Sequence, residues 1–182
     1  MTLNDWYEKG MAPDTYIESM EKHKADLLYI YDQFTVPNDE EFFKQIHARK
    51  LRVLILTEDW CADAMLNVPI LFRIAEHTGM GVSLFPRDAN LELMDQYLTN
   101  GKSRSIPLFV FIDKNGNEVA KWGPRAEKIQ QFLNDSRSNL PSKEADDYQE
   151  KLNQMLLFLT KSFRDNTDFW DEVYQNIKKT IQ

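Results

Sequence analysis

The order of apolar and polar positions divides the chain into a helical first part, a central part with strands and a helical last part. Apolar residues recur at helical spacing over residues 13–34, where Asp14 is placed to cap the helix. Pro37 interrupts this pattern, and the acidic residues after it favour a second helix over about residues 39–50. We therefore predict that residues 1–50 form a helical N-terminal extension packed on the core.

The central part begins with two βα units. The β-branched and leucine-rich run over 52–57 is typical of a strand buried on both faces of a partly parallel sheet. Helical spacing follows over 62–78 and stops at two glycines, as helices often do. A second strand over 82–85 and a short helix over 91–98 complete the β-α-β-α order.

A β-hairpin follows these units. The apolar runs 108–112 and 118–122 flank a turn that contains Asn115-Gly116, and Asn-Gly is the strongest short hairpin signal. Helical periodicity then covers 126–140, and we expect this helix to pack back on the sheet.

Residues 141–182 form a predicted C-terminal helical extension. Helical periodicity begins at about residue 143, and the polar run 165–168 can cap one more helix. The apolar residues of this extension must be covered. We expect them to dock on the chain's own domain, and a homodimer through the C-terminal helices is the alternative.

Composition and charge exclude several classes of protein. The sequence has 11 Phe, 7 Tyr and 4 Trp, a composition that excludes a disordered or low-complexity chain. The net charge of −7 comes from 22 basic and 29 acidic residues spread along the chain, without a basic block. We therefore expect no nucleic-acid partner. No apolar stretch approaches the ~18–20 residues of a membrane span, and the first residues do not resemble a secretory signal.

The few cysteines and histidines limit disulfide and metal chemistry. Cys61 is the only cysteine, so the chain cannot form an internal disulfide or a cysteine-based zinc site. The histidines, His23, His47 and His77, are too far apart in the sequence to form a ligand pair on one helix. We expect no metal and no cofactor, and a reducing, cytoplasmic location fits best.

Four short motifs in register resemble those of the thioredoxin family. The segment Trp60-Cys61-Ala62-Asp63-Ala64 is similar to the Trp-Cys-X-X-Cys segment of that family, with Ala64 in place of the second cysteine. Pro69 stands where thioredoxins have the proline that kinks the active-site helix. Ile106-Pro107 stands where they have their cis-proline, and Asn115-Gly116 matches their hairpin turn.

This resemblance covers about residues 50–140. It implies an α/β, thioredoxin-like fold, in which a mixed central sheet is flanked by helices. The predicted organisation is therefore a thioredoxin-like domain over 51–140, with helical extensions at both ends.

Cys61 is the candidate catalytic residue. It stands where a strand ends and a helix begins, so unpaired N–H groups and the positive end of the helix dipole favour its thiolate. We predict an accessible thiol with a pKa below the ~8.5 of a free cysteine. Asp63 suits the helix dipole but opposes a thiolate, and the sequence leaves the balance open.

The resemblance also implies a substrate groove beside the thiol. It implies a cis peptide before Pro107, where the main chain of Ile106 would meet an extended partner. Trp60 is an aromatic side chain next to the thiol. The predicted substrate-binding residues are therefore Trp60, Ile106 and Pro107, and the neighbouring positions in the site are Ala62, Asp63 and Ala64.

Two departures from the family pattern restrict the chemistry. Without a cysteine at Ala64, a mixed disulfide on Cys61 cannot be resolved within the chain. Ile55 stands where thioredoxins hold a buried aspartate that moves a proton. Glu58 and Asp59 lie near the thiol, where their negative charges would raise its pKa, although loop acids are more often only solvated.

These residues predict a thioredoxin-like monothiol thiol–disulfide oxidoreductase that acts through mixed disulfides. Its partner would be a protein disulfide or a low-molecular-weight thiol, and an external thiol would complete the cycle. The alternative is a non-catalytic thioredoxin-fold module that binds a peptide or protein beside Trp60 and Pro107. The retained Trp-Cys and X-Pro motifs favour the first function, whereas Ala64 and Ile55 favour the second.

Overall fold

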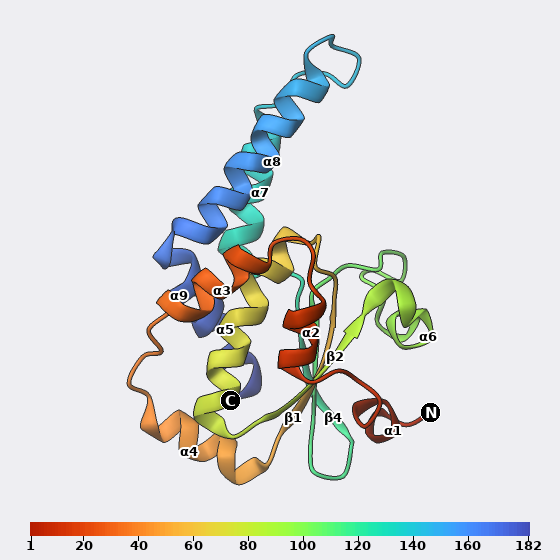
Figure 1. The fold of residues 1–182 in the computed structure, drawn as a ribbon, viewed down its shortest axis with the longest axis vertical. Helices are drawn as coiled ribbons and strands as arrows, with labels where there is room; N and C mark the ends of the chain where they lie inside the picture. The colour runs from red at the N-terminus through yellow and green to blue at the C-terminus, as the bar shows by residue number, and fades with distance from the viewer.

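A four-stranded mixed sheet forms the centre of the molecule in the computed structural model, which describes residues 1–182 (Figure 1). Its order is β2-β1-β3-β4; β1 pairs with β2 in parallel and with β3 antiparallel, and β3 pairs with β4 antiparallel. Residues 53–57 of β1 are all buried, as expected of a strand covered on both faces. The strands are β1 (Arg52–Thr57), β2 (Gly81–Pro86), β3 (Leu108–Ile112) and β4 (Glu118–Trp122).

Helices surround this sheet, and α5 is the most central of them. It follows β1 directly and contacts α3, α4, α8 and α9. None of the helices is both long and apolar enough to cross a bilayer. The helices are α1 (Leu3–Tyr7), α2 (Pro13–Ser19), α3 (Lys24–Gln33), α4 (Glu40–Arg49), α5 (Ala62–Thr78), α6 (Leu91–Met94), α7 (Glu127–Ser138), α8 (Tyr148–Asp165) and α9 (Thr167–Ile181), with 3₁₀ helices η1 (Arg87–Ala89) and η2 (Asp95–Tyr97).

The predicted order of central elements is confirmed. The strands, the intervening helix and the hairpin all lie within a few residues of their predicted bounds. The helix α5 contains Pro69 and is capped at its C-terminal end by Gly79, whose φ of 69° lies in the left-handed region that favours glycine. The Asn115-Gly116 turn joins β3 to β4.

The single helix predicted over residues 13–34 is wrong, because the structure has two helices, α2 and α3, in its place. The break lies at residues 20–23, where the backbone N–H groups of Glu21 and Lys22 donate to Asp59 Oδ2 at 2.8 and 3.0 Å. In a continuous helix these two N–H groups would donate to backbone carbonyls of the preceding turn; here they donate to a carboxylate on a loop 37 residues away. Such a contact leaves no trace in the local periodicity.

The start of the chain also differs from the prediction. Ala12, not Asp14, is the N-cap of α2, and Pro13 takes the first helical position, where a missing N–H costs nothing. The structure has a further short helix, α1, that the periodicity does not indicate. A capping box between Thr2 and Asp5 begins α1, and this pair is a sequence signal that could have identified the helix.

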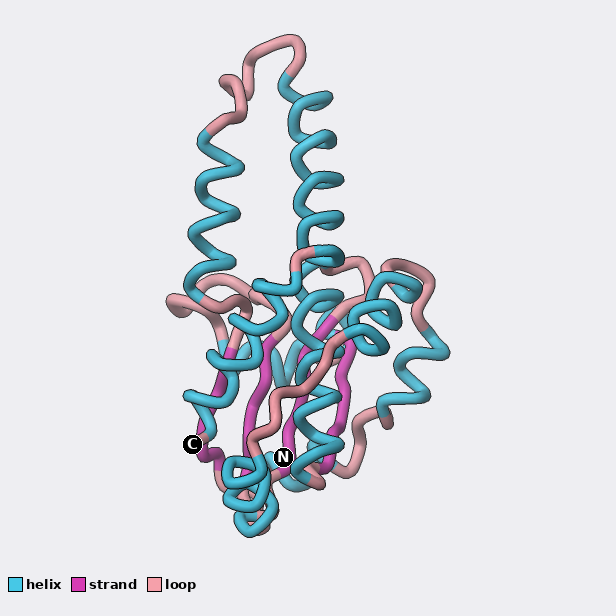
Figure 2. Tube along the Cα trace, turned by 90° about the vertical axis from the view of Figure 1, so that its left-hand side faces the viewer, coloured by secondary structure: helices cyan, strands magenta, loops and turns pink.

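The helix α9 packs in the main core, whereas the hairpin of α7 and α8 lies largely outside it. The side chains of Val173, Tyr174 and Ile177 in α9 are fully buried in the main hydrophobic core. In contrast, α7 and α8 form a hairpin, residues 127–165, that projects beyond the sheet (Figures 1 and 2). We call this hairpin the helical arm. A separate small cluster holds its two helices together: Leu133, Met155 and Leu159.

Candidate active site

The structure places Cys61 beside the main chain that precedes β3. Cys61 is the N-cap of α5, as predicted, and its Sγ donates to the carbonyl oxygen of Ile106 at 3.5 Å. The Ile106–Pro107 peptide is cis, which confirms the expectation for this bond. Two segments 45 residues apart in the sequence thus meet at one thiol.

Trp60 lies exposed next to this thiol. Its side chain is 44 % exposed, and the guanidinium of Arg87 lies 5.1 Å from the centre of its ring, within the range of a cation–π contact. This exposed aromatic surface is available to a partner that reaches Cys61.

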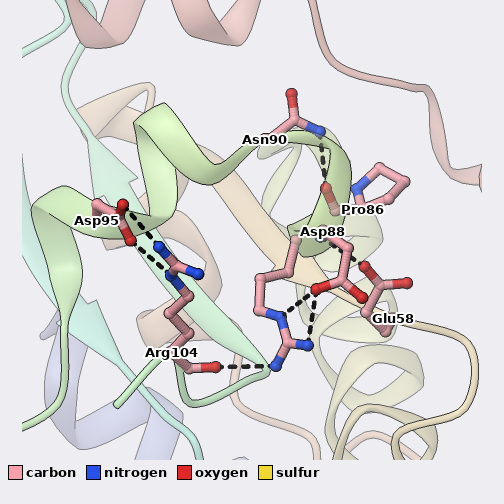
Figure 3. A network of polar contacts seen from close by, with 7 residues as sticks. Glu58, Pro86, Asp88, Asn90, Asp95 and Arg104 are labelled. Atoms are coloured by element: carbon pink, nitrogen blue, oxygen red, sulfur yellow. Dashed lines mark hydrogen bonds and ion pairs between the residues drawn. The ribbon is translucent and has the colours of Figure 1, made fainter. Parts of the chain in front are cut away.

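The loop that carries Trp60 and Cys61 is held at two points. Glu58 Oε1 accepts the backbone N–H of Asp88 at 2.8 Å (Figure 3). On the other side, Asp59 accepts the two N–H groups at the break between α2 and α3. Glu58 and Asp59 therefore fix the loop, and the simple description of them as solvated loop acids is wrong.

A second set of polar contacts holds the segment that leads to Pro107. Arg87 Nη1 donates to the carbonyl oxygen of Arg104 at 3.1 Å. The side chain of Arg104 in turn makes two hydrogen bonds with the Asp95 carboxylate, at 2.7 and 2.9 Å (Figure 3). These contacts connect η1, η2 and the strand entry next to the thiol.

A partly buried ion pair joins the first turn of α5 to Arg125. Asp63 is 9 % exposed, and its Oδ1 accepts the Nε of Arg125 at 2.7 Å. Arg125 also donates to the side chain of Gln130 at 2.9 Å. The sequence identifies Asp63 but carries no signal for Arg125, which lies 62 residues away after β4.

The next turn of α5 makes one more polar contact with the segment after β4. The Nδ2 of Asn67 donates to the carbonyl oxygen of Pro124 at 3.0 Å, and the Gly123–Pro124 peptide is cis. Together with the Asp63–Arg125 pair, this hydrogen bond fixes the start of the helix against the β4–α7 connection.

The environment of Cys61 favours a neutral thiol. Burial, together with the nearby charge of Asp63, raises the pKa of Cys61 to about 11, against the opposing influence of the Ala64 and Asp63 N–H groups and of Arg125. The thiol is also only 8 % exposed. The expectations of an accessible thiol and of a lowered pKa are therefore both wrong, because burial and a like charge outweigh the helix start.

The two departures from the family pattern are visible in the structure. Ala64 is buried within α5, where it supplies no second thiol, and Ile55 is fully buried in β1, where it supplies no carboxylate. Ala62 is partly buried. No group of three or more histidine, cysteine or acidic side chains comes together in a way that could hold a metal ion.

Comparisons with known proteins agree with this architecture. A family model described as thioredoxin matches residues 10–140. A comparison with curated proteins finds no match.

Two solved structures match over almost the whole chain. One is a protein of unknown function from Pseudomonas aeruginosa, 12 % identical, with a TM-score of 0.69 and coverage of 98 % of this chain and 96 % of that one. The other is an HIV epitope scaffold, 11 % identical, with a TM-score of 0.68 and the same coverage. At this level of identity, the likeness concerns the fold.

Proposed function

The chain belongs to the thioredoxin family, and from this premise we propose that it is a monothiol thiol–disulfide oxidoreductase that acts through Cys61. The observation that carries the proposal is the position of Cys61 Sγ, at a helix start and 3.5 Å from the Ile106 carbonyl beside Pro107. The exposed Trp60 beside it gives an incoming partner an apolar contact. A single cysteine fits a reducing compartment such as the cytoplasm.

The proposed reaction has two thiol–disulfide exchanges. The Cys61 thiolate attacks one sulfur of a protein disulfide, the S–S bond breaks, and the other sulfur leaves as a thiolate. An external low-molecular-weight thiolate then attacks the substrate sulfur that is bonded to Cys61, the Cys61 thiolate leaves, and the substrate sulfur is left in a disulfide with the external thiol. With Ala64 in the second position, this external thiol is required.

The direct test is adduct formation with a mixed disulfide. The wild-type protein, incubated with a glutathione mixed disulfide of a cysteine peptide, should gain one thiol adduct on Cys61, detected by mass spectrometry. Adduct formation should be faster at pH 9.5 than at pH 7.5, because burial raises the pKa of the thiol. Cys61→Ser is the control. Absence of an adduct at both pH values would contradict the proposal.

A resolving cysteine should convert the site to dithiol chemistry. Ala64→Cys places a thiol one turn from Cys61, where it acts at a high effective concentration, and we expect about a tenfold or greater gain in insulin reduction with dithiothreitol. Ala62→Cys is the matched control, because it adds a thiol at the wrong spacing. Rapid insulin reduction by the wild type would contradict the monothiol assignment.

The raised pKa of Cys61 favours a second candidate, a non-catalytic module that binds a peptide or protein. In that function the main chain of Ile106 and the ring of Trp60 hold an extended segment, and the thiol stays reduced. The same variants separate the two functions. A binding module keeps its peptide affinity in Cys61→Ser and loses it in Trp60→Ala, and Ala64→Cys gives it no reductase activity.

A further inference from the structure

The helical arm carries three consecutive exposed apolar residues. Leu156, Leu157 and Phe158 in α8 are 49 %, 73 % and 55 % exposed, although each is large and apolar. They lie on the hairpin that projects beyond the sheet (Figures 1 and 2). Successive residues of a helix point about 100° apart, so the three do not form one patch. The ring of Phe158 lies 5.8 Å from that of Phe132 in α7, and Leu157 is the most exposed of the three.

The arm has little internal core to hold it. Only Leu133, Met155 and Leu159 are buried between its two helices, whereas the main core contains 43 buried residues. A pair of helices gains most of its stability from packing an apolar face, so contact with a second molecule would bury more of this pair.

One row of residues lies on the outer face of α8, opposite Met155 and Leu159. Its members, all exposed, recur at intervals of four, three and four residues, which places them on one stripe of the helix. We call them the outer row: Glu150, Gln154, Leu157 and Lys161. The acidic member is near one end, the basic member is at the other, and Leu157 is between them.

We propose that the outer row is the contact surface of a homodimer, in which the α8 helices of two chains pack antiparallel around a twofold axis. In that arrangement Glu150 of each chain faces Lys161 of the other, so two ion pairs flank the centre. The two Leu157 side chains then pack against Gln154 of the opposite chain. A parallel pair would instead place Glu150 against Glu150, and like charges would oppose it. The sequence of the row is thus complementary to itself in one direction only.

Sedimentation velocity on the full chain tests the dimer. The wild type should change from monomer to dimer between about 1 µM and about 500 µM, the range expected of a small interface. Leu157→Glu should remain monomeric over this range. A wild type that is monomeric throughout would overturn the proposal and indicate that the surface is covered by another protein or by none.

Charge variants test the antiparallel geometry. Glu150→Lys and Lys161→Glu, each alone, should raise the dissociation constant about tenfold or more, because each creates two like-charged contacts. An equimolar mixture of the two variants, or the double variant, should restore dimer formation, because opposite charges face each other again. Lys179→Glu, on α9, is the control for the change in net charge.

The same measurements can contradict the antiparallel geometry. A dimer that survives Glu150→Lys unchanged, or that the mixture does not restore, has a different interface. The altered side chains are all exposed, so circular dichroism should show the same helix content in every variant. The proposal concerns the arm alone and does not depend on the chemistry of Cys61.

Discussion

The ionisation of the Cys61 thiol is governed by two opposite features of its site. The N-terminal end of α5 favours the thiolate, but burial and the Asp63 carboxylate oppose it, and burial is the largest influence. The raised pKa means that the neutral thiol predominates at physiological pH and that the thiolate fraction grows as the pH rises towards 11.

This balance predicts slow alkylation at neutral pH. The rate of Cys61 modification by iodoacetamide should rise with pH to a midpoint near 11. At pH 7.5 it should be on the order of a hundredfold below that of a free cysteine, because only the thiolate reacts. The rate is measured by mass spectrometry on the native protein and, as a reference, on the urea-unfolded chain. A native midpoint at or below that of the unfolded chain would contradict the prediction.

The Asp63–Arg125 ion pair should shift this midpoint in two directions. Asp63→Asn removes a negative charge and should lower the pKa of Cys61, so alkylation becomes faster; Arg125→Gln removes a positive charge and should raise the pKa, so alkylation becomes slower. Asp32→Asn, at an exposed position on α3, is the control. If both changes at the pair move the midpoint in the same direction, the variants act through altered packing and not through charge.

At the scale of the element, α9 belongs to the core and the outer face of α8 does not. Ile177 is fully buried against the rest of the molecule, whereas Leu157 is 73 % exposed. Truncation of a buried isoleucine removes apolar contacts and leaves a cavity.

We therefore expect two very different effects on stability. Ile177→Ala should lower the free energy of unfolding by about 2–5 kcal/mol. Leu157→Ala should change it by less than about 0.5 kcal/mol at concentrations where the chain is monomeric. Urea unfolding followed by circular dichroism measures both, and equal losses would show that the arm is as well packed as α9.

The elements that could be predicted are those defined by local periodicity. The local apolar pattern alone predicts the strand β1 and the helix α5, and no distant contact changes their bounds by more than a few residues. The Asn115-Gly116 turn predicts the hairpin. The break between α2 and α3 could not be predicted, because it depends on Asp59, a residue of a distant loop.

The same distinction applies to the site. Short motifs identify Cys61, Trp60 and the Ile106–Pro107 peptide, and the structure brings these residues together. Arg125 could not be identified, because its contact with Asp63 exists only after the sheet and α5 have packed. Burial of the thiol is likewise a tertiary property, so the predicted direction of its pKa was wrong.

At the scale of the whole molecule, the N-terminal residues are part of the candidate site. Besides the contacts of Asp59 with the α2–α3 break, the hydroxyl of Tyr16 lies 3.2 Å from the hydroxyl of Thr57 at the end of β1. The first elements of the chain therefore help to position the loop that carries the thiol.

The same N-terminal segment also covers part of the β2 edge of the sheet. Met11 and Leu84 exchange backbone hydrogen bonds of 2.8 and 2.9 Å along β2, which has no other strand on that side. Gly10 makes this approach possible, because a Cβ atom there would lie 2.0 Å from Ser83 Oγ and 2.6 Å from Phe85 Cζ.

This contact has a consequence for the solubility of the protein. An uncovered edge strand presents unpaired N–H and C=O groups that can recruit strands of other molecules into aggregates. Gly10→Ala should displace the segment from β2 and lower the temperature at which light scattering detects aggregation, whereas Lys9→Ala, at the neighbouring exposed position, should leave it unchanged. An unchanged aggregation temperature in Gly10→Ala would mean that β2 does not pair with strands of other molecules even when the segment around Met11 is displaced. The few residues before α2 thus prevent self-association through the β2 edge of the sheet.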